Sequence, residues 1–153
     1  MTEIKIRVAS EADAAVLARL RYELRSSASE IESEAEFIER CTVWMRERLS
    51  SNSSWQCWIA ESDDAPCGNV WAQLVEKIPN PAAETECYVY LTNFYVREDF
   101  RSKGIGTRLL SEVVAWSKAN NAHTVILWPR ERSKTLYARH GFVAADDLMR
   151  LQL

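Results

Sequence analysis

The chain has 153 residues, of which 47% are hydrophobic and 27% are charged, with a formal net charge of −3 and a pI near 5.5. These values predict one globular domain over residues 1–153 with enough apolar surface to form its own core. The acidic balance argues against a nucleic-acid-binding protein, which presents a basic face, and no apolar run reaches the length of a membrane span.

The N-terminal third predicts a strand and two helices. Residues 4–8 alternate between apolar and polar and predict a strand. Residues 10–13, Ser-Glu-Ala-Asp, resemble a capping box and open a helix that the serine-rich residues 26–29 end. A second helix, from about residue 34 to residue 49, has apolar residues at helical spacing with charges opposite them.

Three strands follow these helices. Residues 55–60 and 70–76 predict strands joined by a turn over residues 62–68, which contain Pro, Gly and three polar residues. Residues 79–86 predict an exposed loop. Residues 88–96 predict a long strand that is apolar on both faces and therefore lies inside the sheet.

The stretch from Phe94 to Gly106 predicts a strand, a glycine loop and the start of a helix. The N-terminus of a helix presents unpaired N–H groups and the positive end of the helix dipole, so it binds phosphate. Gly104 and Gly106 let the backbone approach a pyrophosphate closely, and Arg101 and Lys103 add cationic donors. The loop therefore predicts a diphosphate site.

Two other kinds of phosphate-binding loop do not fit the sequence of this loop. The chain has no Gly-x-x-x-x-Gly-Lys-Ser/Thr motif, which excludes a P-loop. A dinucleotide fingerprint requires a third glycine where this chain has Leu109. An ordinary strand-to-helix turn with incidental glycines stays open on the loop alone.

The C-terminal part predicts a strand, a short helix and a further strand. Residues 123–128 form a compact apolar run typical of a buried strand. Ser133 is placed to cap a helix over residues 134–139, which Gly141 ends. Residues 142–143 resume a strand.

Two segments together resemble the GNAT superfamily of N-acetyltransferases. Arg101-x-x-Gly104-x-Gly106 is similar to the loop that binds the coenzyme A pyrophosphate in that family. Ser133-x-x-Leu136-Tyr137-x-x-x-Gly141-Phe142 is similar to its second signature. The resemblance covers at least residues 88–153. It implies an α/β (α+β) fold, the GNAT acetyltransferase fold, with a central mixed, mostly antiparallel sheet of about six to seven strands flanked by about four helices.

The resemblance also implies the activity, an acetyl-CoA-dependent N-acetyltransferase in which a primary amine attacks the thioester directly in a ternary complex. A bulge near the end of the central strand, at residues 93–96, would direct a backbone N–H at the thioester oxygen. The implied cofactor contacts are Phe94, Tyr95, Val96, Arg101, Ser102, Lys103, Gly104, Ile105, Gly106, Thr107, Ser133 and Tyr137.

Two residues are candidates for proton transfer. Tyr137 stands where many members of the family place the tyrosine that protonates the departing sulfur, and packing of the short helix is its alternative role. Glu86 is a candidate base that would act through water, and a solvated loop charge is its alternative role. Two histidines and cysteines without Cys-x-x-Cys spacing do not indicate a metal site, and acetyl-CoA is the only cofactor expected.

Aromatic and acidic residues near the two N-terminal helices and the central strand predict an acceptor site for a cationic or amphipathic amine. These residues are Tyr22, Trp44, Trp71, Glu76, Glu84, Glu86, Tyr88 and Tyr90. The expected acceptor is a small molecule such as an amino acid, a polyamine or an aminoglycoside-like compound. A protein or peptide N-acetyltransferase and a non-catalytic acyl-CoA-binding sensor module stay as alternatives, and a homodimer is left open.

The cysteines and the N-terminus bear on the cellular location. Cys41, Cys57, Cys67 and Cys87 are widely spread, which predicts buried, reduced thiols rather than a disulfide scaffold. Residues 1–4 do not resemble a signal peptide. Together these features predict a cytoplasmic protein.

Overall fold

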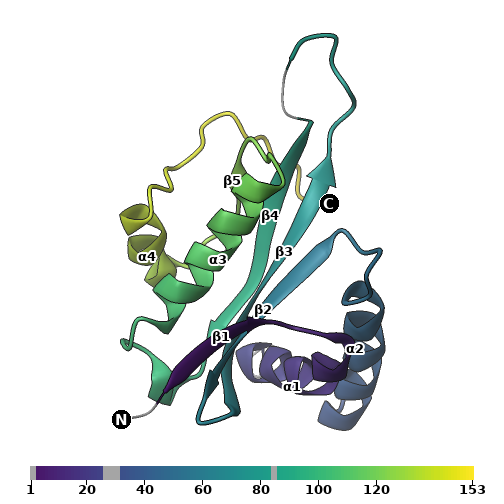
Figure 1. The fold of residues 1–153 in the computed structure, drawn as a ribbon, viewed down its shortest axis with the longest axis vertical. Helices are drawn as coiled ribbons and strands as arrows, with labels where there is room; N and C mark the ends of the chain where they lie inside the picture. The colour runs from purple at the N-terminus through teal and green to yellow at the C-terminus, as the bar shows by residue number, and fades with distance from the viewer. Residues whose placement is uncertain (1–2, 26–31, 84–85) are drawn as a thin grey trace.

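The computed structural model describes residues 3–25, 32–83 and 86–153, in which one five-stranded sheet runs in the order β1-β2-β3-β4-β5 (Figure 1). Four strands pair antiparallel, and the fifth pairs parallel with β4. Their bounds are β1 (Ile4–Val8), β2 (Trp55–Ser62), β3 (Ala65–Glu76), β4 (Cys87–Val96) and β5 (Val125–Ile126). The helices are α1 (Ala14–Arg25), α2 (Glu34–Arg48), α3 (Ile105–Ala119) and α4 (Lys134–Arg139), with short 3₁₀ turns at Glu11–Asp13, Glu98–Phe100 and Glu131–Ser133.

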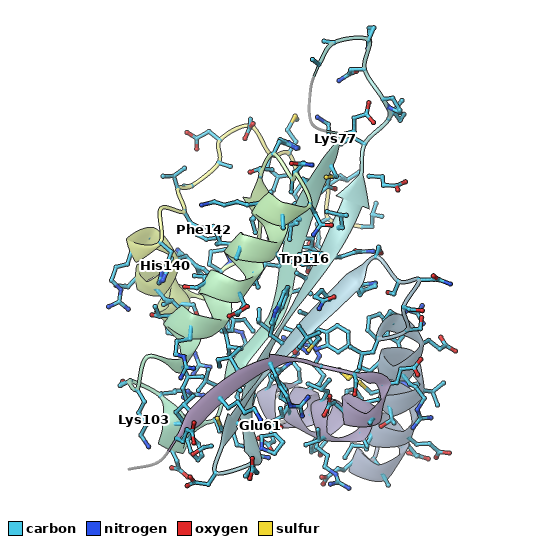
Figure 2. The ribbon with its side chains drawn as sticks, viewed as in Figure 1. Glu61, Lys77, Lys103, Trp116, His140 and Phe142 are labelled. Carbon is cyan, nitrogen blue, oxygen red and sulfur yellow. The ribbon has the colours of Figure 1, made fainter. Side chains whose placement is uncertain are left out.

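The two faces of the sheet bury two separate cores, because successive side chains of a strand point to opposite faces. Along β2, Cys57 and Ile59 face α1 and α2, where they pack with Leu17, Leu20 and Met45. The alternate residues Trp58 and Ala60 face α3 and pack with its apolar stripe of Ile105, Leu109, Leu110 and Val113. Figure 2 shows Trp116 directed from α3 toward the sheet, where its ring meets that of Trp58 at 5.7 Å.

An ion-pair cluster fixes the start of α1 against the sheet. Arg7 on β1 donates to both oxygens of Asp13 at 2.8 and 2.9 Å and to Glu61 on β2 at 2.6 Å. The backbone N–H of Ser10 also donates to Asp13, at 2.7 Å, so the capping box expected at residues 10–13 is present. Hydrogen bonds from Arg7 and Ser10 lower the pKa of the Asp13 carboxyl to about 2.

The turn between β2 and β3 is shorter than the sequence predicted. Only Asp63 and Asp64 lie outside the strands, with φ of 50° and 61°. Both residues therefore occupy the left-handed region that a tight two-residue hairpin requires, which Asp tolerates. Pro66 and Gly68, expected in the turn, belong to β3. A Cβ at Gly68 would lie 2.9 Å from the carbonyl oxygen of Tyr95, so this glycine is needed for close approach of β3 to β4.

The sheet has five strands, not the predicted six to seven, and the four helices agree with the prediction. The strand expected at residues 142–143 is not formed. Gly141, with φ of 85°, ends α4 as predicted, and the N–H of Phe142 then donates to the carbonyl of Tyr137 at 3.1 Å. Phe142 is thus held at the end of α4, and Val143 beyond it is 87% exposed.

The serine-rich stretch at 26–29, expected to end α1, lies outside the described residues. All four cysteines are free, with Cys57 and Cys67 buried and Cys41 and Cys87 only partly so. Among the residues that the structure describes, no helix combines the length and apolar character needed to cross a membrane.

Asp13→Asn tests the cluster at the start of α1. The carboxyl has a pKa of about 2 in the folded protein against 3.8 as its ordinary value, so its stabilising contribution is present above pH 4 and is lost as the pH falls toward 2. We expect the substitution to lower the free energy of unfolding by about 1–2 kcal/mol at pH 7, after allowance for partial exposure, and by much less near pH 2. Urea denaturation across this range measures both values. The exposed Asp147→Asn is the control, and a difference between wild type and Asp13→Asn that does not vary with pH would contradict the assignment.

Candidate functional site

The site lies where β4 and β5 separate. The two strands pair over only two positions, Val89 with Val125 and Tyr90 with Ile126. Beyond this point β4 continues to Val96, whereas the chain after β5 turns away toward α4. The edge of β4 that faces this gap therefore carries backbone groups without a neighbouring strand.

A bulge in β4 lies at the same place. Asn69 of β3 pairs with Tyr95 and Trp71 pairs with Thr92, so two residues of β4, Asn93 and Phe94, stand opposite one residue of β3. Asn93 has φ of 51°, in the left-handed region, and its carbonyl accepts a bond from the Asn69 amide at 3.4 Å. The bulge expected within residues 93–96 is thus present. It bends β4 at the place where two cavities of the molecule adjoin.

The first pocket is a cavity of about 570 Å³ between the end of β4, the start of α3 and α4. It contains most of the residues that the sequence analysis assigned to the cofactor, namely Phe94, Tyr95, Val96, Arg101, Ser102, Gly104, Ile105, Gly106, Thr107 and Ser133. Lys103 is not among the lining residues. Its ammonium lies 5.0 Å from the ring of Phe100, on the outer side of the loop, where Figure 2 shows it directed away from the helices.

The loop before α3 aims backbone N–H groups at this pocket. Ser102 and Gly104 have φ of 60° and 76°, and α3 begins directly after Gly104. Ile105, Gly106 and Thr107 occupy the first turn of α3, whose amide groups have no partner within the helix. Arg101 donates through Nε to the carbonyl of Val96 at 3.1 Å, which holds its guanidinium at the pocket wall.

The first pocket is also lined by two arginines and a leucine that were not predicted from the sequence as site residues. Arg132, Leu136 and Arg139 follow one another at helical spacing, on one side of α4 and its preceding 3₁₀ turn. That spacing is the signal that could have identified them, since residues three and four apart share one helix face. Together with Arg101 and the first turn of α3 they form a site suited to a polyanion.

The second pocket is a cavity of about 240 Å³ on the other side of the bulge. One wall is Tyr90 to Phe94 of β4, and the facing wall comes from residues 127–133. The third wall is the C-terminal part of α1, with Arg21, Leu24 and Arg25. Phe94, Arg132 and Ser133 line both pockets, so the two cavities adjoin.

Tyr137 lies at the boundary, as part of the lining of the second pocket. Its side chain is buried, with 7% exposed, and its ring meets those of Phe94 and Phe142 at 6.1 and 5.5 Å. Burial raises the pKa of the Tyr137 phenol to about 12, so the hydroxyl stays protonated at neutral pH. Ser133, expected to cap α4, makes no side-chain cap bond and instead lines both pockets.

Glu86, proposed from the sequence as a base, lies far from this boundary. It immediately precedes β4, at the opposite end of the strand from Phe94, and it lines neither pocket. At about 3.3 Å per residue the two positions are separated by more than about 20 Å. A base at Glu86 could not reach an amine held at the boundary, even through one water molecule.

The acceptor residues expected from the sequence are also spread over the molecule. Tyr90 does line the second pocket, where its ring meets that of Trp128 at 5.2 Å. Trp71 is only 1% exposed and packs against Trp44 and Trp55 in the core under α1 and α2. The remaining expected residues are not lining residues, and Glu84 lies outside the described part of the chain.

Within the described residues, no group of three or more His, Cys, Asp or Glu side chains is arranged to hold a metal ion. The chemistry available at the boundary is thus that of backbone donors, a protonated phenol and guanidinium groups. Such groups stabilise negative charge that develops on a bound molecule.

Comparisons with known proteins agree with this geometry. Residues 17–142 match the family model described as the acetyltransferase (GNAT) family. The fold is similar to that of a predicted acetyltransferase with acetyl-CoA from Clostridium acetobutylicum, at 23% identity and a TM-score of 0.82, covering 98% of this chain and 96% of that one. It is also similar to a GCN5-related N-acetyltransferase from Ralstonia eutropha JMP134, at 22% identity and a TM-score of 0.80, covering 98% and 99% of the two chains. No curated protein sequence matches.

The left-handed conformation of Asn93 generates a stability prediction. A residue with a Cβ pays about 1–2 kcal/mol in this region, whereas Gly does not, and Asn is among the residues that tolerate it. We expect Asn93→Ala to have a free energy of unfolding about 1 kcal/mol or more below that of Asn93→Gly, although Ala is ordinarily the better strand residue of the two. Both variants lose the Asn93 amide equally, so the comparison isolates the backbone. If urea denaturation finds Asn93→Ala as stable as Asn93→Gly, the bulge does not hold this conformation in solution.

Proposed function

The chain belongs to the acetyltransferase (GNAT) family, and we propose that it moves the acetyl group of acetyl-CoA to a primary amine of a small molecule, by direct attack in a ternary complex. The observation that carries this proposal is the junction of the two pockets at Phe94 and Ser133, beside the bulge and Tyr137. A cofactor in one cavity and an amine in the other would meet at that junction.

The first pocket suits coenzyme A in size and charge. Its 570 Å³ lies within the range of roughly 300–1,000 Å³ that ligand pockets occupy. The first turn of α3 and Arg101 would bind the pyrophosphate, and Arg132 and Arg139 supply further cations along α4. The extended acyl-bearing arm would then run along the free edge of β4 toward the bulge.

The chemistry requires stabilisation of an oxyanion and of a departing thiolate. The bulge frees backbone donors of β4 for the thioester oxygen, in the low-dielectric gap between β4 and β5. Tyr137 is the hydroxyl available to the thiolate. Burial raises the pKa of the Tyr137 phenol to about 12, above the roughly 8.5 of a free thiol, so complete transfer of the phenol proton is unfavourable. Tyr137 therefore acts chiefly as a hydrogen-bond donor to the developing thiolate, which takes its proton from water as it leaves.

Two alternatives are less well supported. A sensor module needs only the first pocket, and it gives no reason for a second cavity with a buried phenol at the junction. A protein or peptide acceptor needs an extended groove, whereas the second pocket is a cavity of about 240 Å³ between three walls. The four free thiols support a reducing compartment, and we retain the cytoplasm as the proposed location.

Gly106→Val tests the cofactor site. A Cβ at this position would lie 3.4 Å from Leu136 Cδ2 and 3.6 Å from Phe94 Cζ, both in the lining of the first pocket. These are ordinary contact distances, so one methyl group would be tolerated, and the two further methyl groups of Val are needed to fill the space before the first turn of α3. We expect the rise in melting temperature produced by coenzyme A or acetyl-CoA, measured against the unliganded variant, to shrink clearly, because the first turn of α3 can no longer approach the pyrophosphate.

The control for this experiment is Glu112→Ala, at an exposed position of the same helix. It should keep the full shift. An equal shift in Gly106→Val and wild type would place coenzyme A elsewhere and remove the basis of the proposed function.

Tyr137→Phe tests the role of the hydroxyl. A hydrogen bond to a charged group is worth about 1.5–3 kcal/mol, so kcat should fall by about 10- to 100-fold while acetyl-CoA affinity and stability change little. The phenol pKa of about 12 adds a second expectation, namely that ionisation of Tyr137 gives no falling limb in the wild-type rate between pH 7 and 10. Steady-state kinetics with separate calorimetry of cofactor binding measures both. A fall in kcat of less than about twofold would make Tyr137 a packing residue only.

A further inference from the structure

Among the described residues that line the second pocket, four are arginines and none is acidic. They are Arg21 and Arg25 from α1 and Arg130 and Arg132 from the segment that precedes α4. The whole chain has a net charge of −3, so this concentration of positive charge is local. Within the described residues, no Asp or Glu forms an ion pair with any of the four.

Arg21 is the central member of this group. It is half-buried, and among the described residues its side chain donates one hydrogen bond, to the amide oxygen of Asn93 on the bulge at 3.3 Å. A guanidinium has five N–H donors, so Arg21, which lines the cavity, keeps donors available for a bound molecule. Burial, with the nearby positive charges of Arg25 and Arg130, lowers the pKa of Arg21.

Arg7 and Arg97, two other partly buried arginines, have carboxylate partners, whereas Arg101 at the wall of the first pocket has none among the described residues. Arg7 pairs with Asp13 and Glu61, and Arg97 pairs with Glu23 at 2.6 Å. Removing a charge from water without a partner is costly, and placing like charges around it adds to the cost. The lack of a carboxylate partner at Arg21 is therefore accounted for if a bound anion completes the site, as the pyrophosphate is proposed to do at Arg101.

We propose that the acceptor amine carries an anionic group, a carboxylate or a phosphate, which Arg21 binds together with Arg25 and Arg130. This inference rests on the proposed function, because it names the class of molecule that the second pocket holds. The phosphates of the cofactor are not an alternative source of the charge for Arg21 and Arg25, since α1 contributes no residue to the first pocket.

The same arrangement has a consequence for the reacting nitrogen. An amine attacks only when it is neutral, and nearby positive charge lowers the pKa of a bound ammonium. The arginines thus favour the reactive form of an amine held at the junction, in a pocket whose described lining offers no carboxylate to act as a base. A polycation such as a polyamine is repelled by the same field, in contrast to the cationic acceptor expected from the sequence.

The experiment measures coenzyme A release with matched pairs of amines. One pair is an α-amino acid and its carboxamide, and a second pair is an amino sugar with and without a phosphate ester. Spermidine represents the polycations. We expect the anionic member of at least one pair to have a kcat/KM at least about tenfold higher, as charge-assisted hydrogen bonds give, and the pair that responds distinguishes carboxylate from phosphate.

Variants assign the preference to the arginines. Arg21→Met should reduce the ratio of kcat/KM between the anionic and the neutral member by about tenfold, mainly through KM, and Arg21→Lys should retain part of it. Arg130→Met removes an exposed member of the group and should reduce the ratio in the same direction, which covers the case in which Arg21→Met does not fold. Arg19→Met, at an exposed position on the same helix, is the matched control and should leave the ratio unchanged.

Calorimetry on the coenzyme A-loaded protein separates the two proposals. If no amine releases coenzyme A but the anionic member of a pair binds and Arg21→Met abolishes that binding, the transfer activity fails and the anion site stands. Equal kcat/KM and equal binding within both pairs, a preference for spermidine, or an unchanged ratio in both Arg21→Met and Arg130→Met would overturn the anion site while leaving the transfer activity in place. Absence of binding by every anionic amine would also overturn it.

Discussion

The early end of the pairing between β4 and β5 is the constraint on which the site depends. After Tyr90 and Ile126 the strands share no further ladder positions, yet β4 continues for six more residues to Val96. A strand edge inside a protein must find other hydrogen-bonding partners or hold a ligand. The bulge at Asn93 and Phe94 lies along this free edge, and the two pockets lie on either side of it. Separation of the strands, the bulge and the cavities are thus parts of one backbone arrangement.

The charged and polar groups of the site lie in three regions, the first pocket, the second pocket and the boundary between them. Arginines and helix amides line the first pocket, and arginines without carboxylate partners line the second, while the buried phenol of Tyr137 lies at the boundary. Every one of these groups donates hydrogen bonds, and the described lining of both pockets contains no carboxylate. An environment of this kind stabilises negative charge wherever it develops and disfavours additional positive charge. The proton that the amine loses during the reaction therefore passes to water rather than to an acidic side chain.

Local patterns in the sequence identified much of this fold, and contacts between distant residues were missed. The glycine loop and the signature around Tyr137 are short and contiguous, so their positions in the first pocket and at its boundary could be predicted. Arg21 and Asn93 are 72 positions apart, and no periodicity connects them, so the basic wall of the second pocket was not predicted. Pro66 and Gly68 were placed in a turn because both residues usually break strands. Gly68 lies inside β3 for the opposite reason, since a side chain there would meet the backbone of β4.

Helix α1 lines the second pocket but not the first, and this difference has an evolutionary consequence. The first pocket is built by residues 94–107 and 132–139, which are close to one another in sequence, whereas the wall with Arg21, Leu24 and Arg25 comes from a helix near the other end of the chain. Mutations in that helix can therefore alter the choice of partner molecule while the donor site is inherited unchanged. A lineage built on this architecture can exchange one acceptor for another by stepwise substitution along one face of one helix, without an intermediate that has lost its donor.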